Sequence, residues 1–195
     1  MKNIVKLFLG LLIIGSVSTS CSDADNAVDQ LFNDVDTSGA ILRTLVEPAD
    51  LVFLTGDNNS IDITIEVQEG DGQSAPNFTQ VRVYVSLFQD QELIIPIVDE
   101  NGQDTSEKLM MTINSSEFGV SEINNLPSYE INLGTPTVVE SFPGAVFTTP
   151  SFISTRLELE LADGRIFSNE QVTATVATGS YFNSPFLYKT IFINN

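Results

Sequence analysis

The chain has no histidine, no tryptophan and only one cysteine, Cys21, among its 195 residues. Without histidine, the usual Ser–His and Cys–His nucleophile pairs and histidine metal ligands are excluded. A single cysteine cannot form an intrachain disulfide, so an apolar core must stabilise any folded domain. The lack of tryptophan, the usual stacking residue for sugars, weakens a glycan-binding function without excluding it.

Basic residues are scarce as well. Eight Lys and Arg stand against 26 Asp and Glu, which gives a formal net charge of −18. An acidic field of this size repels phosphate backbones, so nucleic acid is excluded as a partner. The sequence also has no G-x-S-x-G, P-loop or dinucleotide-binding motif. We therefore expect no enzyme and no organic cofactor.

No apolar run is long enough to cross a membrane. The longest, residues 7–17 (LFLGLLIIGSV), has 11 residues and follows Lys2 and Lys6, whereas a bilayer-spanning helix needs about 20. A positive start followed by a short apolar run is typical of a secretory signal peptide. We therefore assign residues 1–20 to a signal peptide.

The only cysteine stands directly after this segment. Thr19 and Ser20 fit the small positions of a bacterial lipobox before Cys21, although Ser18 occupies the position where Leu is most usual. An ordinary signal-peptidase site that leaves a free thiol is the alternative. We predict cleavage before Cys21 and lipid attachment to it, with several acyl chains anchoring the protein to the membrane.

Residues 21–38 are predicted to be a lipidated, acidic and flexible tether. Ser22, rather than Asp, follows the cysteine, as in lipoproteins that are not retained in the inner membrane. The acidic stretch at 22–26 resembles the surface-export signal of Bacteroidetes lipoproteins, and a solvated spacer is its alternative. We expect an outer-membrane, surface-exposed protein, with the periplasmic face as the alternative.

Alternation of apolar and polar residues dominates the chain from Gly39 onward. Ile61, Ile63 and Ile65 point one way and their neighbours the other, as in a strand with one buried face. Strands are predicted at 40–46, 61–67, 81–88, 92–98, 108–114, 129–133, 156–161, 172–177 and 187–193, with one short helix at 135–142. Residues 39–195 therefore predict a single antiparallel β-sandwich, immunoglobulin-like or fibronectin-III-like, with a jelly roll as the alternative.

The dipeptide Asp163-Gly164 predicts a hairpin with a two-residue type I′ turn. Glu158 and Glu160 share a strand face beside Arg156, at a spacing of about 6.5–7 Å that inverting glycosidases also use. Two exposed neighbours share one environment, however, so their pKa values are not driven apart as catalysis requires. We interpret them as a solvated row.

Calcium is the one metal that the sequence leaves open. Asp99, Asn101 and Asp104 place oxygen-bearing side chains around Gly102, and residues 57–60 (DNNS) are similar. Hard cations prefer such ligands. Neither segment has EF-hand spacing, and Asp, Asn and Gly are also the standard residues of hairpin loops.

Aromatic residues gather near the C-terminus in the segment GSYFNSPFLY, which contains Tyr181, Phe182, Pro185, Phe186 and Tyr188. We expect a chain corner whose rings close one end of the sandwich. An exposed docking patch is the alternative, and Tyr84 with Phe88 is a second candidate patch.

Three segments, taken with the leader, resemble a family of small, largely uncharacterised Bacteroidetes surface lipoproteins. They are residues 39–44 (GAILRT), 162–168 (ADGRIFS) and 182–186 (FNSPF). Members of this family tend to accompany outer-membrane nutrient-uptake systems of the starch-utilisation type. The shared motifs are structural, so the resemblance carries over no catalytic residue.

The resemblance implies a lipid-anchored binding or accessory module of the cell envelope. Its expected partners are the membrane, through the lipid on Cys21, and an outer-membrane transporter or a glycan or protein ligand. The alternatives are a Ca²⁺-dependent adhesion module and, more distantly, a carboxylate-based hydrolase.

Overall fold

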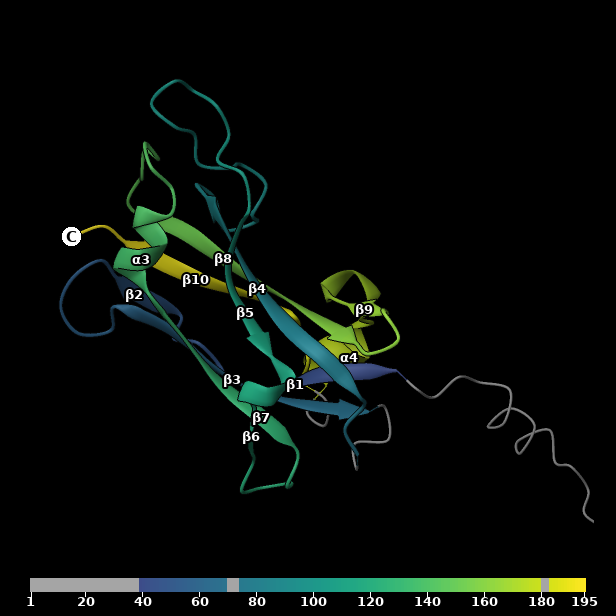
Figure 1. Cartoon of the computed structure of the whole chain (residues 1–195). Coiled ribbons are helices and arrows are strands. Elements are labelled where there is room, and N and C mark those ends of the chain that lie inside the picture. The colour runs from purple at the N-terminus through teal and green to yellow at the C-terminus, as the bar shows by residue number, and fades with distance from the viewer. Residues whose placement is uncertain (1–38, 70–73, 180–182) are drawn as a thin grey trace, which may run out of the picture. The chain divides into compact units, whose positions relative to one another are not determined.

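The computed structural model describes residues 39–69, 74–179 and 183–195. The expected signal peptide, Cys21 and the tether lie outside these ranges. The described chain forms two packed β-sheets (Figure 1). In spatial order, one sheet contains β1 (Ala40–Val46), β3 (Ser60–Glu69), β7 (Pro127–Gly134) and β6 (Gly119–Val120). The other contains β2 (Leu51–Phe53), β10 (Leu187–Ile193), β8 (Ser151–Leu161), β4 (Phe78–Phe88) and β5 (Lys108–Asn114), with β9 (Ile166–Phe167) paired to β8.

The order of the strands is immunoglobulin-like. Lettered along the chain, β1, β3, β7 and β6 correspond to A, B, E and D of one sheet, and β4, β8 and β10 to C, F and G of the other. The strand β5 adds to the C edge, as in the larger immunoglobulin variants. The predicted sandwich is confirmed.

One strand pair is parallel, whereas the sequence predicted antiparallel pairing throughout. The chain leaves the first sheet after Val46, passes Pro48, and joins the second sheet at β2 without reversing. There β2 runs parallel to β10, with Leu51 opposite Ile191 and Phe53 opposite Ile193. Side-chain alternation reports which face of a strand is buried but not the direction of its partner, so this pair was missed.

The core lies between the sheets and follows the predicted alternation. Its fully buried residues include Ile61, Ile63 and Ile65 of β3, Val81, Val83 and Val85 of β4, and Leu157 and Leu159 of β8. Burying one such side chain contributes about 1.5–3 kcal/mol. With no disulfide available, this inter-sheet core is the main source of stability.

Two predicted strands are wrong. Residues 172–177 contain no strand, because Ala174–Thr178 forms the short helix α4, which begins after Thr173 and ends before Gly179. Residues 92–98 are a loop that makes only isolated bridges, at Pro96 and Val98. The predicted short helix at 135–142 is confirmed as α3 (Thr135–Glu140), with Pro136 in its first turn. Single 3-10 turns occupy Ser115–Glu117 and Asn169–Gln171.

The hairpin at Asp163-Gly164 exists, but its turn has three residues rather than two. Gly164 N–H donates to the carbonyl oxygen of Leu161 (3.0 Å), and Leu161 N–H donates to that of Arg165 (2.9 Å). Only Gly164 has positive φ, at +87°. This is the pattern of a type I turn followed by a left-handed residue. The Asp163 carboxylate accepts from Arg165 N–H (3.0 Å), so it supports the turn without adopting positive φ.

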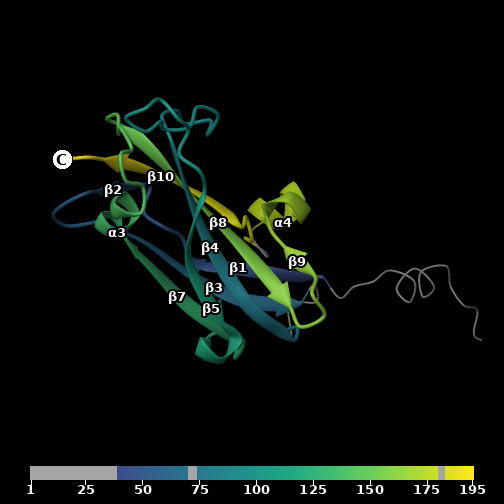
Figure 2. The ribbon, with the colours of Figure 1, turned by 45° about the horizontal axis from the view of Figure 1, so that its top comes forward.

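The start of β1 and the connection between β4 and β5 lie at opposite ends of the sandwich. Figure 1 shows this connection extending beyond the strands, while β1 begins at the far side, and Figure 2 shows the same from a view turned by 45°. The end of β4 is consistent with this, because Phe88 lies opposite Phe152 at the start of β8, whereas Phe78 lies opposite Leu161 at its end. Within the described ranges, no helix is both long enough and apolar enough to traverse a lipid bilayer.

Candidate functional site

The connection between β4 and β5, residues 89–107, is the most conspicuous loop of the described chain. Connections in compact domains usually have about 4–6 residues, and much longer ones are typically binding loops or disordered segments. This one has its own hydrogen bonds and its own buried residue. We refer to residues 89–107 as the long loop.

The long loop is fixed to the sandwich at its middle. Ile97 is fully buried, and its N–H donates to the carbonyl oxygen of Leu87 (2.9 Å) while its own carbonyl accepts from Thr105 N–H (2.9 Å). The carbonyl of Val98 accepts from Val146 N–H (3.0 Å), in the connection that follows α3. The loop is therefore ordered by main-chain bonds on both sides.

The first turn of the loop is built around Asp90. Its carboxylate accepts from Ile95 N–H (2.6 Å) and from Ile94 N–H (3.2 Å), and Gln89 N–H donates to the Ile95 carbonyl (2.8 Å). Leu93 has φ of +59°, which a bulky side chain rarely adopts. The turn leaves Ile94 74% exposed and Ile95 53% exposed. We refer to residues 93–95 as the tip.

The hydrogen bonds at the tip affect the titration of Asp90. Partial desolvation raises the pKa of Asp90, but the backbone N–H groups of Ile95 and Ile94 outweigh it and hold that pKa below its usual value. The carboxylate is therefore ionised at neutral pH, which is the form that accepts these bonds.

The calcium candidates Asp99, Asn101 and Asp104 lie in the second turn of the long loop. The Asp99 carboxylate accepts from the backbone N–H groups of Asn101 (2.8 Å) and Gln103 (2.9 Å). The N–H of Gln103 has the largest influence on the pKa of Asp99 and lowers it, with Asn101 adding to the effect. Asp99 thus serves as a turn residue, as Asp commonly does.

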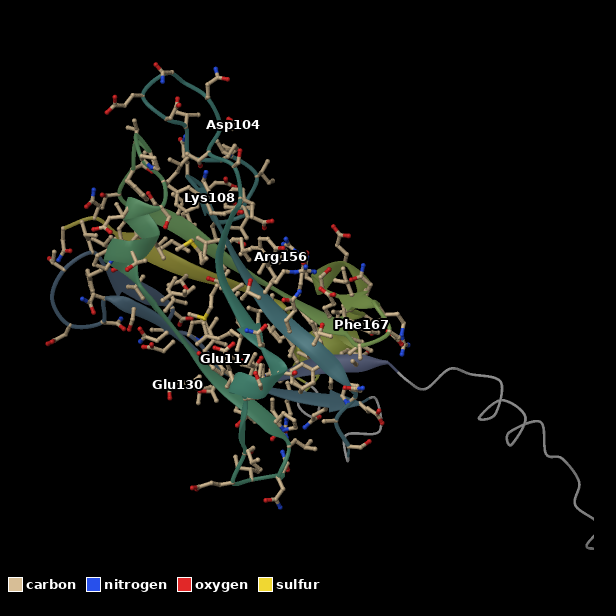
Figure 3. The ribbon with its side chains drawn as sticks, viewed as in Figure 1. Asp104, Lys108, Glu117, Glu130, Arg156 and Phe167 are labelled. Atoms are coloured by element: carbon tan, nitrogen blue, oxygen red, sulfur yellow. The ribbon has the colours of Figure 1, made fainter. Side chains whose placement is uncertain are left out.

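The structure does bring Asp99 and Asp104 together. They line a small polar cleft of about 190 Å³ together with Lys108 and Phe142. Figure 3 labels Asp104 in the upper part of the loop and Lys108 nearer the strands. In the part of the chain that the structure describes, no group of three or more His, Cys, Asp or Glu side chains is arranged so that it could hold a metal ion. The side-chain amide of Asn101 donates to the Asp99 carboxylate (3.4 Å). In the second calcium candidate, residues 57–60, the Ser60 hydroxyl donates instead to the Asp62 carboxylate (2.8 Å).

The glutamate pair on β8 belongs to a row of ion pairs on the outer face of the sheet. Arg82 contacts Glu158 (3.1 Å) and Glu160 (3.2 Å), and Arg156 contacts Glu158 (2.6 Å) and Glu107 (2.6 Å). The five residues Arg82, Glu107, Arg156, Glu158 and Glu160 are called the ion-pair row below, and Figure 3 labels Arg156 within it.

The pKa of Glu158 does not fit the role of a general acid. Desolvation raises the pKa of Glu158, but the guanidinium groups of Arg156 and Arg82 outweigh it, so that this pKa lies below its usual value. A catalytic acid needs a raised pKa. The ring of Tyr84, in the second predicted docking patch, is covered by the Arg156 guanidinium, which lies 4.4 Å from the ring centre. Phe88, the other member of that patch, is half-buried.

The aromatic corner near the C-terminus packs inward where it is described. Phe186 is fully buried, and Tyr188 is almost so, with its hydroxyl 2.8 Å from that of Thr44. Burial raises the pKa of Tyr188 to about 12. Pro185 is half-buried, and Tyr181 and Phe182 lie outside the described residues. For Phe186 and Tyr188 the expected chain corner is confirmed.

The same corner covers the free edge of β1. Thr44 N–H donates to the Asn183 carbonyl (2.8 Å), and the Ser184 hydroxyl donates to the Leu42 carbonyl (2.7 Å). These main-chain groups face away from β3, the partner strand of β1. The corner therefore acts as a short cover for that strand.

The tip was missed by the sequence analysis, because LIIPIV was interpreted as a strand. The available signal was the placement of this apolar run between acidic residues, with Asp90 four residues before Ile94. No known protein-family model matches the chain, and no curated protein matches it either. The site is therefore interpreted from its own geometry.

Proposed function

We propose that the protein is a lipid-anchored binding module of the cell envelope, held to the membrane through Cys21 and offering the long loop to a partner. One structural observation carries the proposal: β1, which follows the anchor in the chain, begins at the end of the sandwich opposite the long loop. A module anchored at one end meets its partner most freely at the other.

The exposed surface of the tip supports binding rather than catalysis. The glutamates on β8, which were the candidates for a hydrolytic acid–base pair, are paired with arginines. Instead, the tip exposes Ile94 and Ile95 on an ordered loop. Functional residues are often presented in this way, on loops that a rigid scaffold positions.

We place the module at the outer membrane, facing the cell surface, as an accessory to nutrient uptake. The sequence after Cys21 supports this placement: Ser22 is not an inner-membrane retention signal, and Asp23 and Asp25 resemble a surface-export signal. The resemblance to Bacteroidetes surface lipoproteins points to the same role. The tether of 18 residues would let the sandwich reach up to about 60 Å from the membrane.

The anchor is tested by replacing Cys21. In Cys21→Ala we expect the protein to leave the membrane fraction, because the lipid attachment site is gone. The matched control is Ser22→Ala, which keeps the cysteine and should stay with the membrane. If Cys21→Ala still partitions into detergent like the wild type, the proposed anchor is wrong.

The surface location is tested by protease treatment of intact cells. We expect Asp23→Ala with Asp25→Ala to reduce cleavage, because the export signal is weakened. Asp34→Ala with Asp36→Ala removes the same charge further along the tether and should leave cleavage unchanged. Equal cleavage of both double variants would contradict the assignment of a signal to the first pair.

A further inference from the structure

We propose that Ile94 and Ile95 form the apolar anchor of a protein–protein interface, and that the partner carries an apolar pocket bordered by Lys and Arg. The proposal deepens the function proposed above and rests on it, because the anchored orientation gives the long loop its access. It adds the residues that make the contact and the chemistry of the surface that receives them.

Exposure is the first argument. Two adjacent isoleucines, 74% and 53% exposed, project from a loop, and Leu93 and Pro96 extend the apolar run on either side. Scattered single apolar residues are normal on protein surfaces, but a contiguous apolar patch with a polar border marks an interaction site. Interfaces draw most of their affinity from a few such side chains buried in a pocket of the partner.

Preorganisation is the second argument. The Asp90 carboxylate accepts from both isoleucine N–H groups, and the Lys189 ammonium donates to the Gln91 carbonyl (3.1 Å) from β10. Leu93 is held in a left-handed conformation, which persists only where the surroundings impose it and is frequent at functional sites. A tip that is already shaped loses less entropy when a partner binds.

Charge is the third argument, and it selects the partner. The long loop contains no Lys or Arg and six acidic residues, which are Asp90, Glu92, Asp99, Glu100, Asp104 and Glu107. Three cations reach the loop from the sandwich: Lys189 donates to the Gln91 carbonyl, Arg156 pairs with Glu107, and Lys108 lines the cleft of Asp99 and Asp104, so the acidic residues still outnumber the basic ones. A surrounding of this sign repels an anionic lipid surface and also a second copy of this acidic chain. It favours a protein surface with a basic border.

The test uses a photoreactive benzophenone side chain placed at position 94 or 95 of the full-length, lipidated protein on intact cells. The matched control carries it at position 123, because Ile123 is 73% exposed but lies between β6 and β7. We expect position 94 or 95 to give at least tenfold more of one discrete protein adduct than position 123. The adducted peptide, mapped by mass spectrometry, should contain apolar residues flanked by Lys or Arg.

Two variants separate the anchor from its support. With the probe at position 94, Ile95→Asp should lower the adduct at least tenfold while leaving the melting temperature unchanged, because Ile95 is largely exposed. Asp90→Asn should lower the adduct yield less, by about threefold, because Asp90 positions the tip without touching the partner. The same variant should speed hydrogen exchange at the Ile94 and Ile95 amides. Raising the salt concentration to about 1 M shortens the Debye length to about 3 Å. The attraction between the acidic loop and a basic partner surface is then screened, so the adduct yield should fall as well.

Several outcomes would overturn the proposal. They are an adduct no stronger than from position 123, an adduct that Ile95→Asp leaves intact, an adduct with a second copy of the chain, or an adducted peptide without basic residues. Binding of the Cys21→Ala chain to phosphatidylethanolamine–phosphatidylglycerol vesicles (3:1), abolished by Ile94→Asp, would also overturn it in favour of lipid. Each of these outcomes contradicts the role of the tip alone. Failure of the proposed lipid anchor would instead be seen as Cys21→Ala remaining in the membrane fraction.

Discussion

The ion-pair row on β4 and β8 and the long loop are both rich in carboxylates, but they use them differently. In the row, Glu158 lies against the guanidinium groups of Arg82 and Arg156. In the loop, Asp90 and Asp99 accept backbone N–H groups instead. Glu158 contributes to the pairing of charges across a sheet, whereas Asp90 and Asp99 hold the shape of the loop.

The apolar residues of the two regions differ in the same way. Leu157 lies directly beneath the ion-pair row and is fully buried, whereas Ile94 at the tip faces solvent. In one region apolar area stabilises the fold, and in the other it is exposed. The comparison therefore separates residues that maintain the structure from those that we propose to serve binding.

The largest expected effect tests this separation directly. Leu157→Ala should lower the free energy of unfolding by about 2–5 kcal/mol, because it leaves a cavity in the core. Ile94→Ala removes apolar atoms that the fold does not bury and should change that free energy by less than about 0.5 kcal/mol. Chemical denaturation of the chain from residue 22 measures both. Similar losses from the two variants would show that the tip is part of the stabilising core.

The turn between β8 and β9 gives the next largest effect. Gly164 has φ of +87°, and a Cβ added there would meet no atom within 4 Å. Gly164→Val should therefore destabilise the protein through backbone strain alone, by about 1–2 kcal/mol. The control is Gly39→Val, where a Cβ is equally free but φ is not positive. If Gly39→Val costs as much, strain at the turn is not the cause.

A smaller effect is expected from the ion-pair row, and it depends on pH. The pKa of Glu158 is lowered in the folded state, so its contribution is fully present above its unfolded pKa, about 4.3. It is lost as the pH falls through the lower folded pKa. Glu158→Gln should cost at most about 1 kcal/mol at pH 7, and the difference from wild type should shrink as the pH falls below about 4.3.

The control for this experiment is Glu130→Gln, at an exposed position of β7 that Figure 3 labels. It should change the free energy of unfolding by less than about 0.5 kcal/mol at neutral pH. A difference for Glu158→Gln that grows toward acid pH would contradict the assigned sign and the role of the arginines.

The smallest effect is expected from calcium in the long loop. Because backbone N–H groups already occupy the Asp99 carboxylate, millimolar Ca²⁺ should raise the melting temperature no more than Mg²⁺ does. Differential scanning calorimetry on the wild type and on Asp99→Asn with Asp104→Asn measures this. A Ca²⁺-specific rise of several degrees that the double variant removes would make the loop a metal site and break the comparison.

The fold was largely predictable because most strands have one buried and one exposed face. The alternation at Ile61, Ile63 and Ile65 reflects the pleat of β3 directly. It failed at residues 92–98, where Ile94 and Ile95 have strand-like composition but Asp90 folds the main chain into a turn. That turn depends on hydrogen bonds that composition does not encode.

The site was less predictable than the fold for a related reason. Asp99, Asn101 and Asp104 were recognised as oxygen-bearing residues, but the sequence could not show whether Asp99 turns toward a cation or toward its own backbone. The turn at Gly164 was located correctly yet given the wrong length, because the dipeptide Asp-Gly occurs in several hairpin types.

For a protein anchored as we propose, the contacts of Asn183 and Ser184 with β1 limit strand pairing between neighbouring copies. Proteins tethered to a surface are concentrated in two dimensions, and an open strand edge at high local concentration invites pairing with a neighbour and aggregation. Here the outward-facing N–H of Thr44 and carbonyl of Leu42 are hydrogen-bonded to the C-terminal corner. At the other edge of that sheet, β6 has only two residues. The first sheet therefore offers neighbouring copies very little strand to extend.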